Sequence, residues 1–225
     1  MLAVPPVRRA PTHDQQPKQR LTAVGATRVA RSFAIVASMT GTPEIQTVSG
    51  ARINPFTADA AAISIDDIAR ALANLCRFGG HCRAFYSVAQ HSCHVADFVD
   101  ARGGTADETH WALLHDAAEA YLGDLPHPIK QHSSLGQLYR EAEERLQAVI
   151  CECFGLQPTP PLVVKEVDRG MLAAERRDLM LDAWVWPELT GVEPIAIEIS
   201  PWPPDRAADE FRMRHGELAR RRRRE

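Results

Sequence analysis

The chain has 225 residues, a length that fits one globular domain or one domain with terminal extensions. Apolar residues make up 45% of it and charged residues 24%, as in proteins with a packed core. No stretch approaches the ~18 uncharged apolar residues of a membrane-spanning helix, which excludes that class of protein. The five cysteines form no C-x-x-C pair, which argues against a disulfide framework and indicates a cytoplasmic location.

The net charge of −3 is unevenly distributed along the chain. Residues 1–38 carry six basic side chains and one acidic side chain, and Arg220 to Arg224 form an unbroken basic run. Residues 39–219 hold 15 basic and 27 acidic side chains, so their net charge is 15 − 27 = −12. Such a body is poorly suited to nucleic acid, which binds clustered lysines and arginines. Only the basic tail, residues 220–225, could contact nucleic acid, and we expect it to be a solvated, frayed terminus.

The N-terminal segment differs in texture from the rest of the chain. Residues 1–38 are rich in Pro, Gln and Arg and have no amphipathic period, so we expect them to be disordered. A targeting peptide is a second interpretation. The third, which we rank first, is that Met39 is the true start and the extension is an annotation error. A single folded domain is then expected over residues 39–219.

The elements expected in that domain are mostly helical. A small β-hairpin is expected first, formed by residues 44–48 and 52–56 around Ser49-Gly50. Ser64 to Asp67 resemble a capping box at the start of the first helix. Apolar spacing then predicts helices at about 65–77, 87–101, 107–122, 136–154, 160–181 and 205–220.

Two short segments interrupt this helical pattern. Pro126 and Pro128 predict an irregular connection after the helix that ends near Gly123. Ile195, Ile197 and Ile199 alternate as in a short strand, which could join the N-terminal hairpin. The expected fold class is therefore mostly all-α, a helical bundle with a minor β element.

The densest group of chemically active side chains lies in the sequence HDAAEAYLGDLP, residues 115–126. On a continuous helix, His115 and Asp116 would lie about 100° apart, and Glu119 would share their face. Asp124 follows just beyond. An imidazole and three carboxylates in a small volume repel unless a cation or a proton offsets the charge, which favours a divalent metal. The second His-Asp pair, His13-Asp14, lies in the Pro- and Gln-rich segment and has no such context.

Three segments together resemble the HD-domain phosphohydrolase superfamily: SVAQHS (87–92), LLHDAAEAYLGDLPHPIK (113–130) and VKEVDRGMLAAERRDL (164–179). The resemblance covers roughly residues 45–185 and is nearest to the bacterial 5′-deoxynucleotidases and the phage-type deoxynucleotide hydrolases. It implies an HD-domain helical bundle that holds a divalent metal through two His and two Asp. The corresponding ligands here are His91, His115, Asp116 and Asp168.

Mixed nitrogen and oxygen ligands suit Co, Mn, Zn, Fe or Ni, and the sequence does not choose among these metals. His94, three residues after His91, matches no position of the family pattern, and we expect it at the surface or behind the ligands. Cys93 points away from the His91 face and is expected to be a small buried residue.

The resemblance also implies residues that bind and convert the substrate. Arg77 corresponds to a phosphate-binding arginine, and Phe78 stands where the deoxynucleotidases have a Trp beside the sugar or base. The alternative for Arg77 is compensation of a helix dipole. Glu119 and Asp124 are the expected catalytic carboxyl groups, one near the attacking water and one near the leaving oxygen. Spacing does not determine which is the base and which the acid.

The expected function is metal-dependent removal of phosphate from (deoxy)nucleoside 5′-monophosphates. Cleavage of deoxynucleoside triphosphates to triphosphate is the alternative among enzymes, although it needs more cationic groups than the acidic body offers. A non-catalytic regulator that binds metal or nucleotide is the alternative from another class. The expected partners are a nucleotide substrate and no membrane, and a homodimer is left open.

Overall fold

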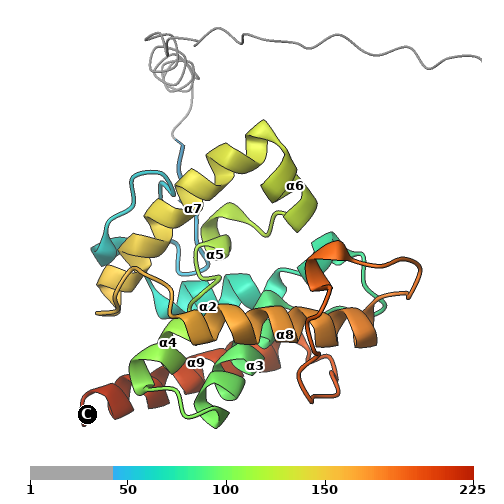
Figure 1. Ribbon diagram of the computed structural model, residues 1–225. Helices are drawn as coiled ribbons and strands as arrows, with labels where there is room; N and C mark the ends of the chain where they lie inside the picture. Colours follow the sequence, from blue (N-terminus) through green and yellow to red (C-terminus); the bar gives the residue numbers. More distant parts are fainter. Residues whose placement is uncertain (1–42) are drawn as a thin grey trace, which may run out of the picture. The chain divides into compact units, whose positions relative to one another are not determined.

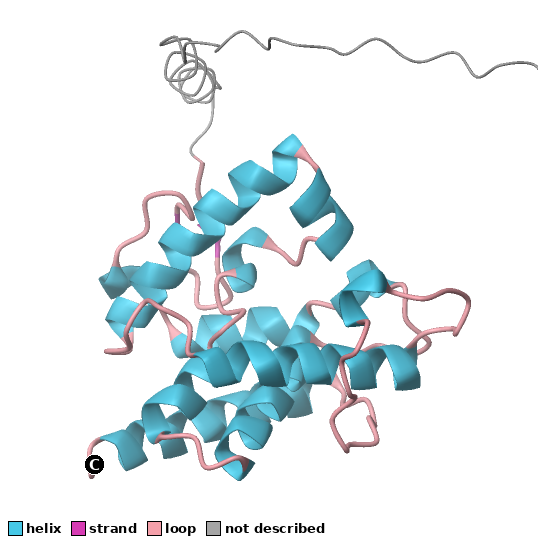
Figure 2. Cartoon of the chain, in the orientation of Figure 1, coloured by secondary structure: helices cyan, strands magenta, loops and turns pink. Residues whose placement is uncertain are grey.

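The computed structural model describes residues 43–225, and it is built mainly of helices (Figures 1 and 2). The expected disordered extension, residues 1–38, lies outside the described residues, as do Met39 and the His13-Asp14 pair. The prediction of a mostly α fold with a minor hairpin is confirmed. The helices are α2 (Ile65–Asn74), α3 (Val88–Ala101), α4 (Ala106–Leu113), α5 (Glu119–Leu122), α6 (His127–His132), α7 (Ser134–Cys153), α8 (Leu162–Leu179) and α9 (Pro204–Arg222).

The predicted hairpin is present but shorter than expected. Strands β1 (Ile45–Gln46) and β2 (Arg52–Ile53) pair antiparallel, with Ile45 opposite Ile53. Its turn is fixed to α2 by Asp67, whose carboxylate accepts hydrogen bonds from the Ser49 amide at 2.9 Å and the Ser49 hydroxyl at 2.8 Å. Asp67 is therefore unavailable for a capping box, and Ser64, although at the N-cap position, makes no side-chain cap bond.

Helix α3 is the centre of the bundle. It packs against α2, α4, α8 and α9, and nine of its 14 residues are buried, including Gln90, His91 and Ser92. Polar residues on the buried sides of such a helix need hydrogen-bond partners within the protein. Gln90 is satisfied by the Ser200 carbonyl at 2.8 Å and the Trp202 amide at 2.8 Å, both in the segment before α9.

The helix expected over residues 107–122 is broken in the middle, which corrects the sequence prediction. Helix α4 begins with a reciprocal capping box between Thr105 and Glu108 and ends at Leu113. Residues 114–118 then form tightened turns with i→i+3 bonds, such as Ala117 N–H to the Leu114 carbonyl at 3.0 Å. His115 and Asp116 therefore lie on a turn rather than on a continuous helix.

Helices α6 and α7 form a helical hairpin beside the rest of the bundle (Figure 1). The predicted irregular connection is present over residues 123–126 but is shorter than expected, because Pro128 occupies the first turn of α6, where its missing N–H costs nothing. The two helices meet at Gly136. A Cβ on that residue would lie 2.2 Å from the Lys130 carbonyl oxygen, so only glycine permits this approach.

Residues 195–199 are not a strand, which corrects a second prediction. Ile195 and Ile199 are buried, which explains their alternation, but the Ile195 amide donates to the Gly170 carbonyl of α8 at 3.1 Å. The segment therefore runs against a helix and has no place in the two-stranded sheet.

None of the helices in the described part combines the length and apolarity that crossing a bilayer requires. All five cysteines are free thiols, and Cys93 is buried as expected.

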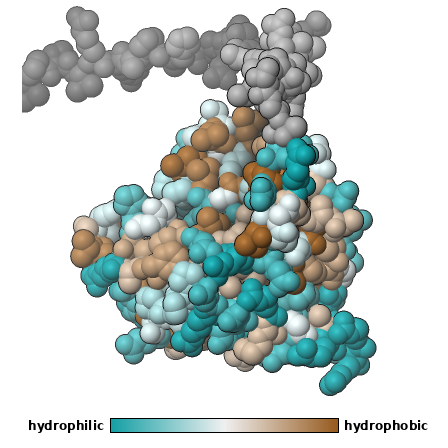
Figure 3. All heavy atoms as spheres, turned by 180° about the vertical axis from the view of Figure 1, so that it is seen from behind, coloured by the Kyte–Doolittle hydropathy of each residue, from teal (hydrophilic) through white to brown (hydrophobic). Residues whose placement is uncertain are grey.

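The basic tail is more ordered than its composition predicts, because α9 extends to Arg222. Arg222 donates to the carbonyls of Phe154 at 2.7 Å and Gly155 at 2.6 Å, which are the free acceptors at the end of α7. Arg221 pairs with Asp100 at 2.5 Å. Hydrophilic side chains dominate this end of the molecule in Figure 3. Part of the arginine run therefore serves as a structural anchor rather than as a free terminus.

A neutral histidine pair joins α4 to α9, and it predicts an acid-sensitive fold. His110 Nε2 lies 2.9 Å from His215 Nδ1, and Arg222 donates to His110 Nδ1 at 3.2 Å. Burial, His215 and Arg222 lower the pKa of His110 to about 3, below its ordinary 6.5. Between these pH values the unfolded chain binds more protons, so the free energy of unfolding falls as pH decreases below 6.5.

Replacing His110 by Asn should remove up to about 1.4 kcal/mol per pH unit of that dependence. Urea unfolding at several pH values from 4.5 to 7.5 measures it. His132→Gln, at an exposed position of α6, is the control and should keep the parental slope. An equal slope in His110→Asn and the parent protein would contradict the assignment.

Candidate metal centre and substrate pocket

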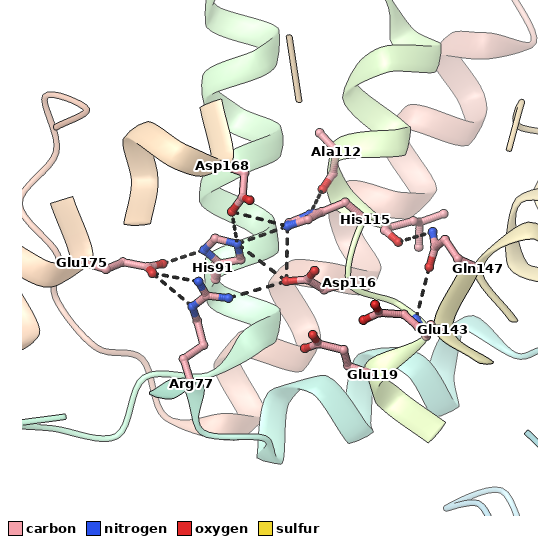
Figure 4. Close-up of polar contacts among 12 residues, drawn as sticks. Arg77, His91, Ala112, His115, Asp116, Glu119, Glu143, Gln147, Asp168 and Glu175 are labelled. Atoms are coloured by element: carbon pink, nitrogen blue, oxygen red, sulfur yellow. Dashed lines mark hydrogen bonds and ion pairs between the residues drawn. The ribbon is translucent and has the colours of Figure 1, made fainter. Parts of the chain in front are cut away.

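Three segments distant in sequence bring His91, His115, Asp116 and Asp168 together (Figure 4). His91 comes from α3 and Asp168 from α8, while the His-Asp pair comes from the turn after α4. The two Nε2 atoms of the histidines lie 3.2 Å apart. Asp168 Oδ1 is 3.1 Å from His91 Nε2, and Asp116 Oδ2 is 3.3 Å from His115 Nε2.

Hydrogen bonds fix the orientation of both imidazoles. His91 Nδ1–H donates to Glu175 Oε1 at 2.6 Å, and His115 Nδ1–H donates to the Ala112 carbonyl at 2.7 Å. With Nδ1 protonated in each ring, the Nε2 lone pairs point at one another and at two carboxylates. Such a set of atoms repels unless a cation or a proton lies among them, and a fixed Nδ1–H is typical of metal-binding histidine.

His91, His115 and Asp116 have ligand atoms within 4.8 Å of one another, so they could hold a metal ion. Asp168 faces the same point through its contact with His91. The residues therefore fit the metal that the sequence predicts. His94, in contrast, packs its ring against Trp202 at 5.0 Å and takes no part in the cluster.

The irregular turn that carries His115 and Asp116 is braced from α7. Gln147 Nε2 donates to the Leu114 carbonyl at 2.8 Å, and its Oε1 accepts from the Ala118 amide at 3.3 Å. These bonds satisfy backbone groups that the broken helix leaves free. His115 takes part in the break itself, because its ring occupies the Ala112 carbonyl that a continuous helix would offer to Asp116.

Glu175 links the cluster to Arg77 and was not identified from the sequence. Besides His91, it accepts from Arg77 Nε at 3.1 Å and pairs with Arg77 NH2 at 3.0 Å. Arg77 NH1 lies 3.6 Å from Asp116 Oδ2. Burial acts to lower the pKa of Arg77, but the carboxylates of Glu175 and Asp116 outweigh burial and raise the pKa above its ordinary value, so the guanidinium keeps its charge beside the cluster. Helix-dipole compensation at the end of α2 does not describe these contacts.

A cavity of about 330 Å³ opens beside the cluster, within the usual size range of small-molecule sites. All the expected substrate-binding and catalytic residues line it, namely Arg77, Phe78, Glu119 and Asp124. The ligand candidates Asp116 and Asp168 line it as well. Lys130, His81 and His127 also line it. The structure therefore brings six of the predicted site residues to one pocket, while the ligand candidates His91 and His115 lie beside it and do not line it.

Phe78 projects into this pocket from a strained backbone. It has φ 59° and ψ 23° in the 3₁₀ turn η2 (Arg77–Gly80), a left-handed conformation that glycine and asparagine favour over aromatic residues. Strain of this kind concentrates where ligands bind.

Two carboxyl groups of the pocket have raised pKa values. Burial raises the pKa of Glu119 well above its ordinary value, and Asp116 and Asp124 raise it further. Its Oε2 has no hydrogen-bond partner among residues 43–225, and its Oε1 lies 4.0 Å from Lys130 Nζ. Burial likewise raises the pKa of Asp124. Raised carboxyl pKa values near a charged cluster are typical of catalytic groups.

Comparison with known proteins places the chain among relatives but assigns no activity. No family model matches the sequence. Over 159 residues the chain is 42% identical to "Uncharacterized protein YfdR" of Escherichia coli (strain K12), covering 70% of this chain and 85% of the relative. Over 193 residues it is 34% identical to "Uncharacterized protein RCAP_rcc00048" of Rhodobacter capsulatus, covering 77% and 94%. The chain therefore belongs to the family that contains these two proteins.

Proposed function

We propose that the protein is a metal-dependent phosphohydrolase that removes phosphate from (deoxy)nucleoside 5′-monophosphates. The observation that carries the proposal is the convergence of two histidine Nε2 atoms with two carboxylates, which line a pocket together with Arg77. The resemblance of the segments that carry these residues to the HD-domain superfamily also supports it. The chemistry that the metal supplies is Lewis acidity, which polarises a phosphoryl oxygen and makes water more acidic.

The side chains of the pocket supply binding and proton transfer. Arg77 offers a planar guanidinium to phosphoryl oxygens, and Glu175 holds that group in place. In the reaction a water oxygen bonds to phosphorus, the bond from phosphorus to the ester oxygen breaks, and a proton ends on that oxygen. In this proposal one of Glu119 and Asp124 takes the proton from water and the other delivers a proton to the leaving group.

The pocket favours a monophosphate over a triphosphate. Two cationic groups of the described chain line it alongside the carboxylates, and both already have carboxylate partners. Arg77 pairs with Glu175, and Lys130 Nζ lies 2.6 Å from Glu143 Oε1. A triphosphate would need cations to offset its additional charge, whereas one phosphate needs only the metal and Arg77.

A panel of phosphate esters tests the proposal. Protein loaded with Mn²⁺ or Co²⁺ is incubated with deoxynucleoside mono- and triphosphates, and inorganic phosphate and triphosphate are separated by ion chromatography. We expect free phosphate and nucleoside from the monophosphates. Release of triphosphate would favour the alternative reaction. Tight nucleotide binding without any product from fully metallated protein would indicate a regulator and overturn the proposal.

A further inference from the structure

The loop between α8 and α9 forms an aromatic rim on the same pocket. Met180, Trp184, Trp186 and Glu188 line the cavity together with Asp116 and Asp168. This loop projects from the bundle at the end of α8 (orange-red in Figure 1). Helix α8, which carries Asp168, therefore leads directly into the rim. The last segment that resembles the HD-domain superfamily, residues 164–179, ends before these tryptophans.

Trp184 is exposed although it is large and apolar, and Trp186 is half-buried. Trp184 is 64% exposed, and its neighbour Val185 is 74% exposed. The Trp184 and Trp186 rings lie 6.2 Å apart, and Trp186 meets the Phe78 ring edge-on at 6.0 Å. Three aromatic rings thus follow one another from η2 to the rim. Flat aromatic faces of this kind bind planar heterocycles by stacking.

The rim is held in place by α8. Arg176 NH2 donates to the Trp184 carbonyl at 2.7 Å and pairs with Asp182 at 2.8 Å. The Arg176 guanidinium also lies 5.8 Å from the centre of the Trp186 ring, within the range of a cation–π contact. Farther along, Arg169 NH2 donates to the Glu188 carbonyl at 2.9 Å. A loop tied down in this way is organised before a ligand arrives, which lowers the entropy lost on binding.

We propose that Trp184 and Trp186 form a base-binding wall, on which the heterocyclic base of the substrate stacks while its phosphate lies at the metal cluster. The pocket accordingly selects nucleotides over sugar phosphates. This inference rests on the proposed phosphohydrolase function for its orientation, but the stacking wall itself requires no reaction. The polar end of the pocket is formed by Asp116, Glu119 and Asp168, and the apolar end of the pocket is formed by Phe78 and the two tryptophans.

Kinetics with a matched pair of substrates test the wall. dAMP and 2-deoxyribose 5-phosphate share the sugar phosphate and differ by the base. Replacing Trp184 and Trp186 by Leu, singly and together, should raise KM for dAMP about 5-fold or more per ring. KM for 2-deoxyribose 5-phosphate should stay within about twofold. Trp186→Phe, which keeps a ring, should recover most of the affinity for dAMP.

The control variant is Trp202→Phe. The Trp202 ring packs under Arg206 at 4.6 Å and against His94, and it does not line the pocket. Its substitution should therefore leave both KM values unchanged. A rise in KM for both substrates in the Leu variants would overturn the wall, because it would show a general effect on the site.

Binding of a nucleoside separates this inference from the proposed function. Deoxyadenosine carries no phosphate, so calorimetric titration of the metal-loaded protein with it measures base binding alone. Binding to the parent and its loss in the double Leu variant would support the wall even if no ester were hydrolysed. Equal binding to both proteins, with normal hydrolysis of dAMP, would overturn the wall and leave the phosphohydrolase proposal standing.

Discussion

His115→Ala and Asp116→Ala are each expected to lose bound transition metal and to abolish phosphate release. Each substitution removes one of the donor atoms that face His91 Nε2, and the remaining atoms cannot enclose an ion. Even residues that only support a ligand are worth 10- to 100-fold in metal affinity, so we expect at least about a 100-fold loss for the ligands themselves. Elemental analysis of the purified variants measures metal content, and ion chromatography measures phosphate release.

The control is His13→Ala, which alters the other His-Asp pair of the sequence. It should retain both metal and activity. Circular dichroism of the two core variants establishes that they are folded, since removing lone pairs that repel should not unfold the bundle. Full metal occupancy in folded His115→Ala and Asp116→Ala would refute the ligand assignment.

Glu119→Gln is expected to bind metal normally but to turn over substrate at least about 100-fold more slowly. Glu119 is 5% exposed, and the amide keeps the shape of this buried side chain. The amide can neither accept nor deliver the proton. Metal content and kcat are measured on the same preparation, so that a lost ion is not mistaken for lost proton transfer.

Glu143→Gln is the matched control for this variant. Glu143 contacts the same lysine as Glu119, because Lys130 Nζ lies 2.6 Å from Glu143 and 4.0 Å from Glu119, but Glu143 does not line the pocket. Its loss should change kcat by less than about threefold. If Glu119→Gln also stays within that range, Glu119 is a buried carboxyl group without a catalytic role.

The sequence predicted the elements whose apolar spacing is regular, and these elements bring most of the candidate site residues close together. Helices α3, α7, α8 and α9 begin and end within a few residues of their predicted bounds, because each carries a continuous periodic pattern. His91 and Asp168 were placed at the cluster by their motifs, and their contact at 3.1 Å agrees with that assignment.

The break after α4 could not be predicted from local sequence. It depends on Gln147, 33 residues from the Leu114 carbonyl that it satisfies, and on a side-chain bond from His115 to Ala112. Local propensity across residues 111–122 favours an unbroken helix, and tertiary contacts override it. The alternation at Ile195 to Ile199 misled for a related reason, since burial against α8 gives the same period as a strand.

Glu175 was missed although a signal was available. It follows Asp168 by seven residues, two turns of helix, and therefore shares its face of α8. A carboxylate on a ligand-bearing face, one helix away from a buried histidine, is the usual partner for that histidine's second nitrogen. Sequence reasoning stopped at the ligands, whereas the residues that orient them follow the same helical spacing.

The left-handed backbone at Phe78 lowers the stability of the fold while it keeps an aromatic ring at the pocket. An L-residue pays about 1–2 kcal/mol for that conformation, a sizeable share of the 5–15 kcal/mol that holds a typical domain folded. Glycine would relieve it. A population of variants selected only for heat resistance should therefore lose the aromatic ring at this position early, whereas selection for substrate turnover should retain it. Glycine at position 78 in a selected variant would therefore indicate selection for stability, and an aromatic residue would indicate selection for turnover.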